Sequence, residues 1–432
     1  MSARLMKGRI PARLAMMAAA TALASLLAAC GGTDVPARGA VLSTSTAIPV
    51  AKASIDAAMA AAQLTPLTGA AACDVTVREI VYATPGPKGG TYDVSAALLL
   101  PTNCTGSMPT PTPLVAYNRG TEILKARAMA NPADSETGVL MALLASQGYA
   151  VVATDYLGYN KSNHPYHPYL HADSQASTTI DSIRAARSVM STLGVSTSGK
   201  LFLTGYSQGG HASLATLKAI QADASLGMTV AAAGPMSGAY SLTNSFAAGL
   251  SFLPTGTGGS SVFTPFVVSA YQKIYGNIYS SPSEFYKSPY ATGIEDLLPG
   301  ALGYTALFTS AKLPVDLGDL VTDTAIAAIA NEASPIRKAL AANDLITGWT
   351  PSVPLALCAG SGDPVVLYDA NTSAALAAFG GASATRFAVD VNAAMNLAGI
   401  DSFSESYHSA AQPFCLRAVR DALFSSFFTQ PG

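Results

Sequence analysis

The segment Lys200–Leu214, with the sequence KLFLTGYSQGGHASL, most constrains what this chain can fold into. Its apolar start is typical of a buried strand, its glycines of a tight turn, and its alanine-rich continuation of a helix. A serine in the pattern Gly-x-Ser-x-Gly at such a junction stands on a sharp turn, with its hydroxyl clear of the sheet edge. Ser207 is therefore the candidate nucleophile, and the competing interpretation is an ordinary glycine-serine turn without chemistry.

The same turn supplies a backbone N–H at the start of the helix. Gly205 and Gly209 leave room where a β-carbon would meet the neighbouring backbone. The N–H of Gln208 lies at the helix N-terminus, where unpaired N–H groups and the helix dipole favour negative charge. We therefore predict Gln208 as one donor of an oxyanion hole.

The composition is that of a large globular protein. The chain has 432 residues, of which 50% are hydrophobic and 12% are charged, so it can bury a sizeable core. The spacing of its motifs favours one domain with an insertion. The net charge of −2 and the lack of long basic runs give no reason to expect nucleic acid as a partner.

The first thirty residues form a segment of another kind. A basic front precedes the apolar stretch Leu14–Ala29, which suits an export signal better than a membrane-spanning helix. Leu27-Ala28-Ala29-Cys30 resembles a bacterial lipoprotein box, in which the cysteine is acylated, and Gly31 resembles the outer-membrane sorting pattern. We expect residues 1–30 to be a lipoprotein signal segment, residues 31–50 to be a tether, and the lipid to be the only membrane contact. The alternative is signal cleavage and release as a soluble protein.

Four cysteines remain after this segment, and an even number suggests disulfide bonds in an oxidising compartment. Four cysteines allow three pairings. We predict Cys73 with Cys104 and Cys358 with Cys415, because each pair falls within one contiguous region. The alternative is that these thiols are buried and free.

Eight short apolar or alternating stretches are predicted strands, and helical patterns separate most of them. The strands are residues 75–82, 92–100, 113–117, 150–154, 201–203, 229–233, 353–359 and 386–391. The helices outside the elbow are predicted over residues 51–69, 138–147, 178–193 and 410–428. Such alternation implies right-handed crossovers and a mostly parallel sheet covered on both faces. We assign this core to residues 51–239 and 350–432.

Residues 240–349 do not fit the alternation. This segment is too long for a crossover and too apolar for a disordered linker, so we interpret it as an inserted cap over the strand ends. Its aromatic side chains suit either a pocket wall for an apolar or aromatic substrate or the cap's own core. They are Phe252, Phe263, Phe266, Tyr271, Tyr275, Tyr279, Phe285, Tyr286 and Tyr290.

A serine nucleophile needs a base, and the chain has five histidines. His408 follows the predicted last strand on a polar loop and precedes the final helix. His211 would point into helix packing, and the histidines at 164, 167 and 171 are interleaved with prolines that disfavour a metal-binding helix. We therefore predict His408 as the base and no bound metal.

Asp363 is the candidate acid. It ends an apolar strand in the turn Gly360–Pro364, from which its carboxylate would orient His408 and stabilise the charged imidazole. A turn-capping aspartate before proline is the competing interpretation. Asp369 and Asp390 are worse placed, because the first falls in a predicted helix and the second in a predicted strand.

The loop after strand 113–117 is the candidate for the second oxyanion donor. Gly120 lets the backbone approach the substrate, and the N–H of Thr121 is the predicted donor. Four residues near the site are predicted to contact the substrate. They are Arg119, Gly120, Tyr156 and Tyr206.

Six segments together resemble the α/β-hydrolase superfamily and, within it, the secretory-lipase-like serine esterases. They are Tyr117–Thr121, Asp155–Gly158, His164–Tyr166, Arg184–Arg187, Gly205–Gly210 and Gly360–Asp363. The resemblance spans about residues 75–428 outside the cap. It implies an eight-stranded sheet, a Ser-Asp-His triad and hydrolysis of carboxylic esters. Two positions depart from the pattern: Arg119 stands where many relatives have histidine, and Ser409 follows His408 where glycine is frequent.

The residues and the resemblance together lead to the hypothesis of an exported serine esterase or lipase that needs no cofactor. Depolymerisation of polyesters is a special case of this activity. The alternatives are a serine peptidase or acyltransferase of the same fold, and a catalytically inactive binding protein. The sequence leaves the oligomeric state open.

Overall fold

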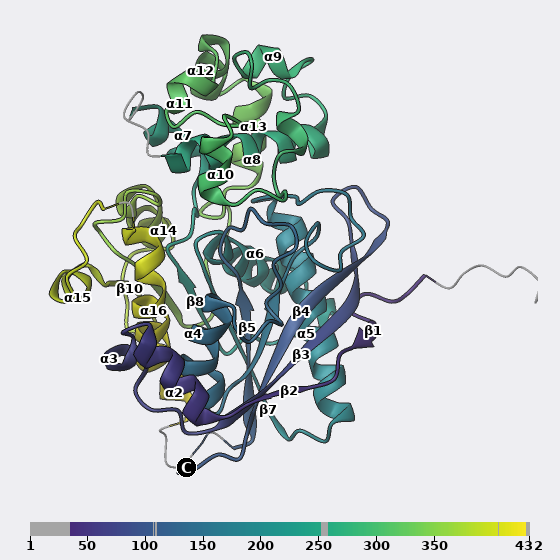
Figure 1. Ribbon diagram of the computed structural model, residues 1–432, viewed down its shortest axis with the longest axis vertical. Coiled ribbons are helices and arrows are strands. Elements are labelled where there is room, and N and C mark those ends of the chain that lie inside the picture. Colours follow the sequence, from purple (N-terminus) through teal and green to yellow (C-terminus); the bar gives the residue numbers. More distant parts are fainter. Residues whose placement is uncertain (1–34, 107, 109, 252–257, 405, 429–432) are drawn as a thin grey trace, which may run out of the picture. The chain divides into compact units, whose positions relative to one another are not determined.

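The computed structural model describes residues 35–428 apart from 107, 109, 252–257 and 405. A mixed sheet with the strand order β1-β3-β4-β6-β5-β7-β8-β9-β10 forms its centre, and β2 pairs with β3 (Figure 1). The six strands β6-β5-β7-β8-β9-β10 are all parallel to one another. Strand β4 is antiparallel to both of its neighbours, β3 and β6. The α/β fold class predicted from the sequence is confirmed.

All eight predicted strands are present among the ten. The strands are β1 (Val41–Thr44), β2 (Ile48–Val50), β3 (Asp74–Pro85), β4 (Thr91–Thr102), β5 (Thr112–Asn118), β6 (Ala150–Thr154), β7 (Thr197–Tyr206), β8 (Ala232–Met236), β9 (Leu355–Ala359) and β10 (Arg386–Asp390). The predicted number of eight strands is too low by two, because β1 and β2 lie within residues 31–50, which the sequence predicts to be a tether. They form because the outer edge of β3 offers free backbone groups: Val41 lies opposite Tyr82, and Ile48 opposite Val77.

Helices cover both faces of the sheet. The core helices are α2 (Lys52–Ala61), α3 (Thr65–Thr68), α4 (Ser135–Leu143), α5 (Ala172–Thr192), α6 (Gln208–Ala222), α14 (Ala374–Ala378), α15 (Asn392–Leu397) and α16 (Tyr407–Val419). One hydrophobic cluster joins α2, α4 and α16 to one face, and a second joins α5, α6 and α14 to the other. The strands alternate accordingly, since Val115 belongs to the first cluster and Leu114 and Ala116 to the second.

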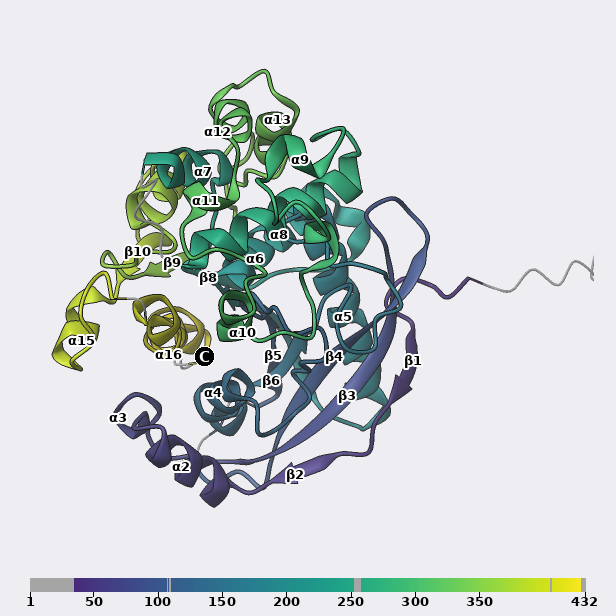
Figure 2. The same cartoon turned by 45° about the horizontal axis from the view of Figure 1, so that its top comes forward.

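A group of helices is inserted in the sequence between β8 and β9. Its members are α7 (Leu242–Ser251), α8 (Gly258–Tyr275), α9 (Pro282–Phe285), α10 (Tyr304–Thr309), α11 (Leu317–Leu320), α12 (Asp323–Ala330) and α13 (Pro335–Ala342). Figures 1 and 2 show these helices together at one end of the sheet. Tyr156 and Tyr159, which follow the carboxyl end of β6, belong to the same buried cluster, so this is the end where a parallel sheet presents its reactive groups. The division into core and cap stays a prediction.

Most of the aromatic side chains in this group form its own core. Phe266, Tyr271, Phe285 and Tyr286 are buried within one cluster, whereas Tyr275 is partly exposed. Phe252 lies outside the described residues. Among the described residues, no helix combines the length and the apolar character that crossing a bilayer requires.

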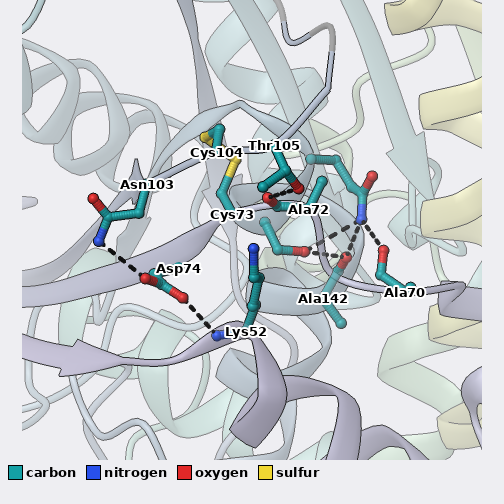
Figure 3. The surroundings of a disulfide bond; sticks show 11 residues. Lys52, Ala70, Ala72, Cys73, Asp74, Asn103, Cys104, Thr105 and Ala142 are labelled. Carbon is teal, nitrogen blue, oxygen red and sulfur yellow. Dashed lines mark hydrogen bonds between the residues drawn. A yellow bond between two sulfur atoms is a disulfide. The ribbon is translucent and has the colours of Figure 1, made fainter.

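Both predicted disulfide bonds are present. The Cys73–Cys104 bond joins the residue before β3 to the segment after β4, beside Asp74, which accepts from the backbone N–H of Lys52 and the side chain of Asn103 (Figure 3). The Cys358–Cys415 bond joins β9 to α16 in the main core. The alternative of free thiols is wrong.

Candidate active site

The turn between β7 and α6 has the sharp geometry that the sequence predicts. Ser207 adopts φ 57° and ψ −116°, a conformation that non-glycine residues rarely take. A β-carbon on Gly209 would lie 1.8 Å from the carbonyl oxygen of Asn118, and one on Gly205 would lie 2.4 Å from the carbonyl oxygen of Gly209. Only glycine fits these two positions, so the pattern around the serine follows from backbone packing.

Three polar side chains from distant parts of the chain meet at this turn. The Nδ1 atom of His408 lies 2.6 Å from Oδ2 of Asp363, and its Nε2 atom lies 2.8 Å from Oγ of Ser207. Because an ionised carboxylate only accepts, Nδ1 carries the proton, and Nε2 is left to accept from the serine hydroxyl. The imidazole is thus in the tautomer that can take a proton from Ser207. The catalytic roles of these residues stay predictions.

Asp363 also fits its competing interpretation as a capping residue. Its Oδ1 accepts from the N–H groups of Val365 and Val366 at 2.8 and 3.0 Å, while Oδ2 faces His408. The side chain is buried, and these bonds fix its orientation. Capping and orienting the histidine are therefore performed together by the two oxygens of one carboxylate. Asp390 instead caps its own turn through the N–H groups of Ser361 and Asn392.

His408 lies in the first turn of α16 and not on the polar loop that the sequence predicts. The helix begins earlier than expected because Tyr407 is fully buried and anchors its first turn. Tyr206 donates its O–H to the carbonyl oxygen of His408, and its ring packs on the imidazole at 5.1 Å between centroids. The structure thus places Tyr206, predicted to contact substrate, where it supports the histidine.

The two predicted oxyanion donors lie on adjoining segments. Gln208 is the first residue of α6, so its N–H has no partner within the helix. The loop that carries Thr121 approaches the same turn closely, since a β-carbon on Gly209 would contact Asn118 and Arg119. Within the described residues, neither N–H group has a hydrogen-bond partner. Both are therefore free to bind a developing negative charge.

The side chains of Arg119 and Tyr156, both predicted to contact the substrate, are buried, and that contact stays a prediction. The guanidinium of Arg119 is fully buried and lies 3.2 Å from Glu122 and 3.5 Å from Asp155. Tyr156 is 1% exposed and donates its O–H to the carbonyl oxygen of Arg119 at 3.0 Å. Arg119 is buried because acidic residues from two segments pair with it. Only the spacing of Arg119 and Glu122 gave a signal for this in the sequence.

Gly120 is held by a residue that the sequence analysis missed. Its N–H donates to Oε1 of Glu136 at 3.0 Å. Glu136 lies in the first turn of α4, where the carboxylate of Asp134 caps the helix by accepting from two N–H groups. The segment Asp134-Ser135-Glu136 looks in the sequence like an ordinary acidic helix start, so nothing in it pointed to the loop.

The remaining histidines each have partners of their own. Burial lowers the pKa of His167 to about 3 and that of His211 to about 4, so both rings are neutral at pH 7. The ring of His167 contacts the carbonyl oxygen of Leu157 at 2.9 Å and the side-chain amide of Gln208 at 2.7 Å. In the part of the chain that the structure describes, no three His, Cys, Asp or Glu side chains are grouped to hold a metal ion.

Comparison with known proteins now places the chain in a family. Residues 125–244 match the family model described as secretory lipase. The crystal structure of the rice cell wall degrading esterase LipA from Xanthomonas oryzae is 34% identical, has a TM-score of 0.80, and is aligned over 90% of this chain and 100% of that one. This chain belongs to the secretory lipase family. It is therefore an α/β-hydrolase and a carboxylic-ester hydrolase, as the resemblance implied.

Two more distant structures share the fold. A Legionella pneumophila protein is 22% identical with a TM-score of 0.77, over 91% of this chain and 99% of that one. Candida antarctica lipase A in its closed state is 16% identical with a TM-score of 0.58, over 88% and 84% of the two chains. No curated protein matched the sequence.

Proposed function

We propose that this member of the secretory lipase family is an exported serine esterase that works through an acyl-enzyme on Ser207. The observation that carries the proposal is the unbroken hydrogen-bond chain from Ser207 Oγ through His408 to Asp363, with distances of 2.8 and 2.6 Å. A serine hydroxyl is a weak nucleophile unless a positioned base takes its proton, and this geometry supplies that base.

In the proposed reaction, Ser207 Oγ attacks the ester carbonyl carbon while its proton passes to Nε2 of His408. Asp363 stabilises the imidazolium, and the N–H groups of Gln208 and Thr121 bind the negative oxygen of the tetrahedral intermediate. The intermediate expels the alcohol, which takes the proton from His408. A water molecule then gives a proton to His408 and attacks the acyl carbon. The second tetrahedral intermediate expels the Ser207 oxygen, which takes the proton from His408, so that the acid is released and Ser207 is regenerated.

The proposed substrate is an ester with an apolar acyl or aromatic group. Support comes from the apolar cluster that joins the helical group between β8 and β9 to the core, in which Phe266 of α8 shares one buried cluster with Ile123 and Tyr169 of the core loops. LipA, the 34% identical relative, is described as a rice cell wall degrading esterase, so an extracellular polymer ester is a specific case to test. Polyesters remain part of this proposal.

We also propose export and attachment to the outer membrane through a lipid on Cys30, which lies outside the described residues. Two disulfide bonds support an oxidising compartment. Metabolic labelling with radioactive palmitate should label the protein, and Cys30→Ser should remove the label. Label-free protein recovered from the medium would instead support release as a soluble enzyme.

The test of the activity compares Ser207→Ala with Ser225→Ala, which changes an exposed serine after α6. A fluorophosphonate probe should label the wild type and Ser225→Ala with one probe molecule per protein molecule, and should not label Ser207→Ala. Turnover of p-nitrophenyl esters should fall by roughly 10⁵-fold or more in Ser207→Ala, as expected for loss of a nucleophile.

Retained turnover in Ser207→Ala would refute the mechanism. A panel of aminoacyl p-nitroanilides and added alcohols separates the alternatives: faster amide cleavage would identify a peptidase, and transfer to alcohol in preference to water would identify an acyltransferase. A protein that is neither labelled nor active on any ester, amide or acyl acceptor would be a binding protein.

A further inference from the structure

The peptide group between Arg119 and Gly120 is held at both ends. Its carbonyl oxygen accepts from the O–H of Tyr156 at 3.0 Å, and its N–H donates to Oε1 of Glu136 at 3.0 Å. The next peptide group carries the N–H of Thr121, the proposed second oxyanion donor. Because consecutive peptide planes share a Cα atom, fixing the first plane limits the direction in which the second N–H can point.

Glycine makes this support necessary. Gly120 has no side chain and adopts a wide range of backbone angles at little cost, so an unsupported peptide at this position could rotate. A β-carbon at Gly120 would meet its first neighbours at 3.6 Å, the carbonyl oxygen of Tyr206, and 3.9 Å, Oε1 of Glu136. Packing therefore leaves the loop space, and the hydrogen bonds define its conformation.

Glu136 is well placed to hold the loop through its carboxylate oxygens. The same Oε1 also accepts from the O–H of Tyr117 at 2.7 Å, so one oxygen joins the end of β5 to the loop that follows it. Burial and the nearby Glu136 carboxylate raise the pKa of Tyr117, which keeps this phenol a donor. The N-terminus of α4 and the guanidinium of Arg127, 3.4 Å from Oε2, favour the negative charge.

We propose that Glu136 is a positioning residue for the oxyanion hole: by holding the N–H of Gly120 it aims the N–H of Thr121 at the negative oxygen of the tetrahedral intermediate. The inference rests on the proposed function, because it takes Ser207 as the nucleophile. It extends that function by assigning a role to a buried carboxylate that touches neither the substrate nor the triad. Tyr156 holds the other end of the same peptide group and acts with it.

The experiment compares three variants. Glu136→Ala removes the acceptor, Glu136→Gln keeps an oxygen acceptor without the charge, and Asp134→Asn is the matched control. Asp134 forms its own ion pair with Arg127, and asparagine retains its capping ability, so the control removes one negative charge from the same cluster without touching the loop. All rates are expressed per active site titrated with the fluorophosphonate probe.

The readouts are kcat, KM and the dissociation constant of an alkyl boronic acid, which forms a tetrahedral adduct with the serine. Removing one oxyanion donor costs about 100- to 1,000-fold in kcat, and misdirecting one costs less. Glu136→Ala should therefore lower kcat and weaken boronate binding by the same factor, about 10- to 100-fold, with KM within about twofold. Glu136→Gln should stay within about threefold of the wild type, and Asp134→Asn should match it.

Unchanged boronate affinity in Glu136→Ala, or a Glu136→Gln variant as impaired as Glu136→Ala, would overturn the proposal. If Glu136→Ala does not fold, Tyr156→Phe carries the test, because it frees the carbonyl end of the same peptide. It should weaken boronate binding by about fivefold or more, and unchanged affinity would count against the inference. Failure of the proposed function is distinguished by Ser207→Ala: turnover there refutes the triad, whatever Glu136 does.

Discussion

The Cys358–Cys415 disulfide bond connects β9, which ends just before the proposed acid Asp363, to α16, which carries the proposed base His408. Cys358 lies in β9, five residues before Asp363, and Cys415 lies on α16, seven residues after His408. Seven residues are two helical turns, so His408 and Cys415 lie on the same side of α16. Breaking this bond by Cys358→Ala/Cys415→Ala should therefore affect both the stability and the geometry of the site.

The magnitude for stability follows from the closed loop. The Cys358–Cys415 bond spans 57 residues and the Cys73–Cys104 bond spans 31. Chain entropy then gives about 4.2 kcal/mol for the first bond and about 3.7 kcal/mol for the second. The double variant Cys73→Ala/Cys104→Ala is thus a control of nearly equal predicted cost, at a position that holds neither Asp363 nor His408.

Of the two double variants, only Cys358→Ala/Cys415→Ala should have a lower kcat than the wild type. A displacement of about 1 Å at a catalytic group can cost about 100-fold in rate, so we expect kcat to fall by at least about 10-fold in Cys358→Ala/Cys415→Ala. Urea unfolding measures stability, and p-nitrophenyl butyrate turnover at 15 °C, per titrated active site, measures kcat. Equal kcat in both double variants would refute the reasoning, since packing and the Tyr206 hydrogen bond would then suffice to hold His408.

Two further predictions concern backbone packing and pH. Gly209→Ala should abolish soluble active protein because its β-carbon would lie 1.8 Å from the Asn118 carbonyl oxygen. Gly303→Ala is the control and should fold normally, because a β-carbon at Gly303 has open space around it. Circular dichroism and labelling with the fluorophosphonate probe measure the folding and activity of each variant. Burial lowers the pKa of His167 to about 3 and of His211 to about 4, so only the unfolded chain gains these protons as pH falls below about 6.5. The unfolding free energy should fall by up to about 1.4 kcal/mol per pH unit for each histidine between pH 6 and 4. The urea midpoint of His211→Gln should therefore depend less on pH than that of the wild type, and an equal pH dependence in the two proteins would contradict this.

Much of the fold could be predicted because its signals are local. The eight core strands are short apolar runs bounded by turn residues, and each of them is found in the sheet. The geometry of Ser207 was predictable for the same reason, since the two glycines around it leave little choice of backbone path. The cysteine pairs followed from proximity along the chain.

The remaining features depend on partners that are distant in the sequence. Strands β1 and β2 lack a strong pattern of their own and form because β3 offers them an edge. The start of α16 depends on the burial of Tyr407, which no local pattern indicates. Whether a tyrosine such as Tyr156 contacts a substrate or a carbonyl oxygen beneath it depends on how three loops pack, and the sequence does not reveal that packing.

Arg119 shows how far such a dependence extends. The arginine precedes Gly120 directly, and in the structure its guanidinium faces two carboxylates. Burial raises the pKa of Asp155, and the positive charge of Arg119 opposes that rise. Breaking a buried ion pair by removing one partner costs about 3 to 5 kcal/mol, because the other charge is left without compensation. An arginine at this position therefore requires Asp155 and Glu122 as partners. These three residues support the same loop whose Gly120 N–H donates to Glu136.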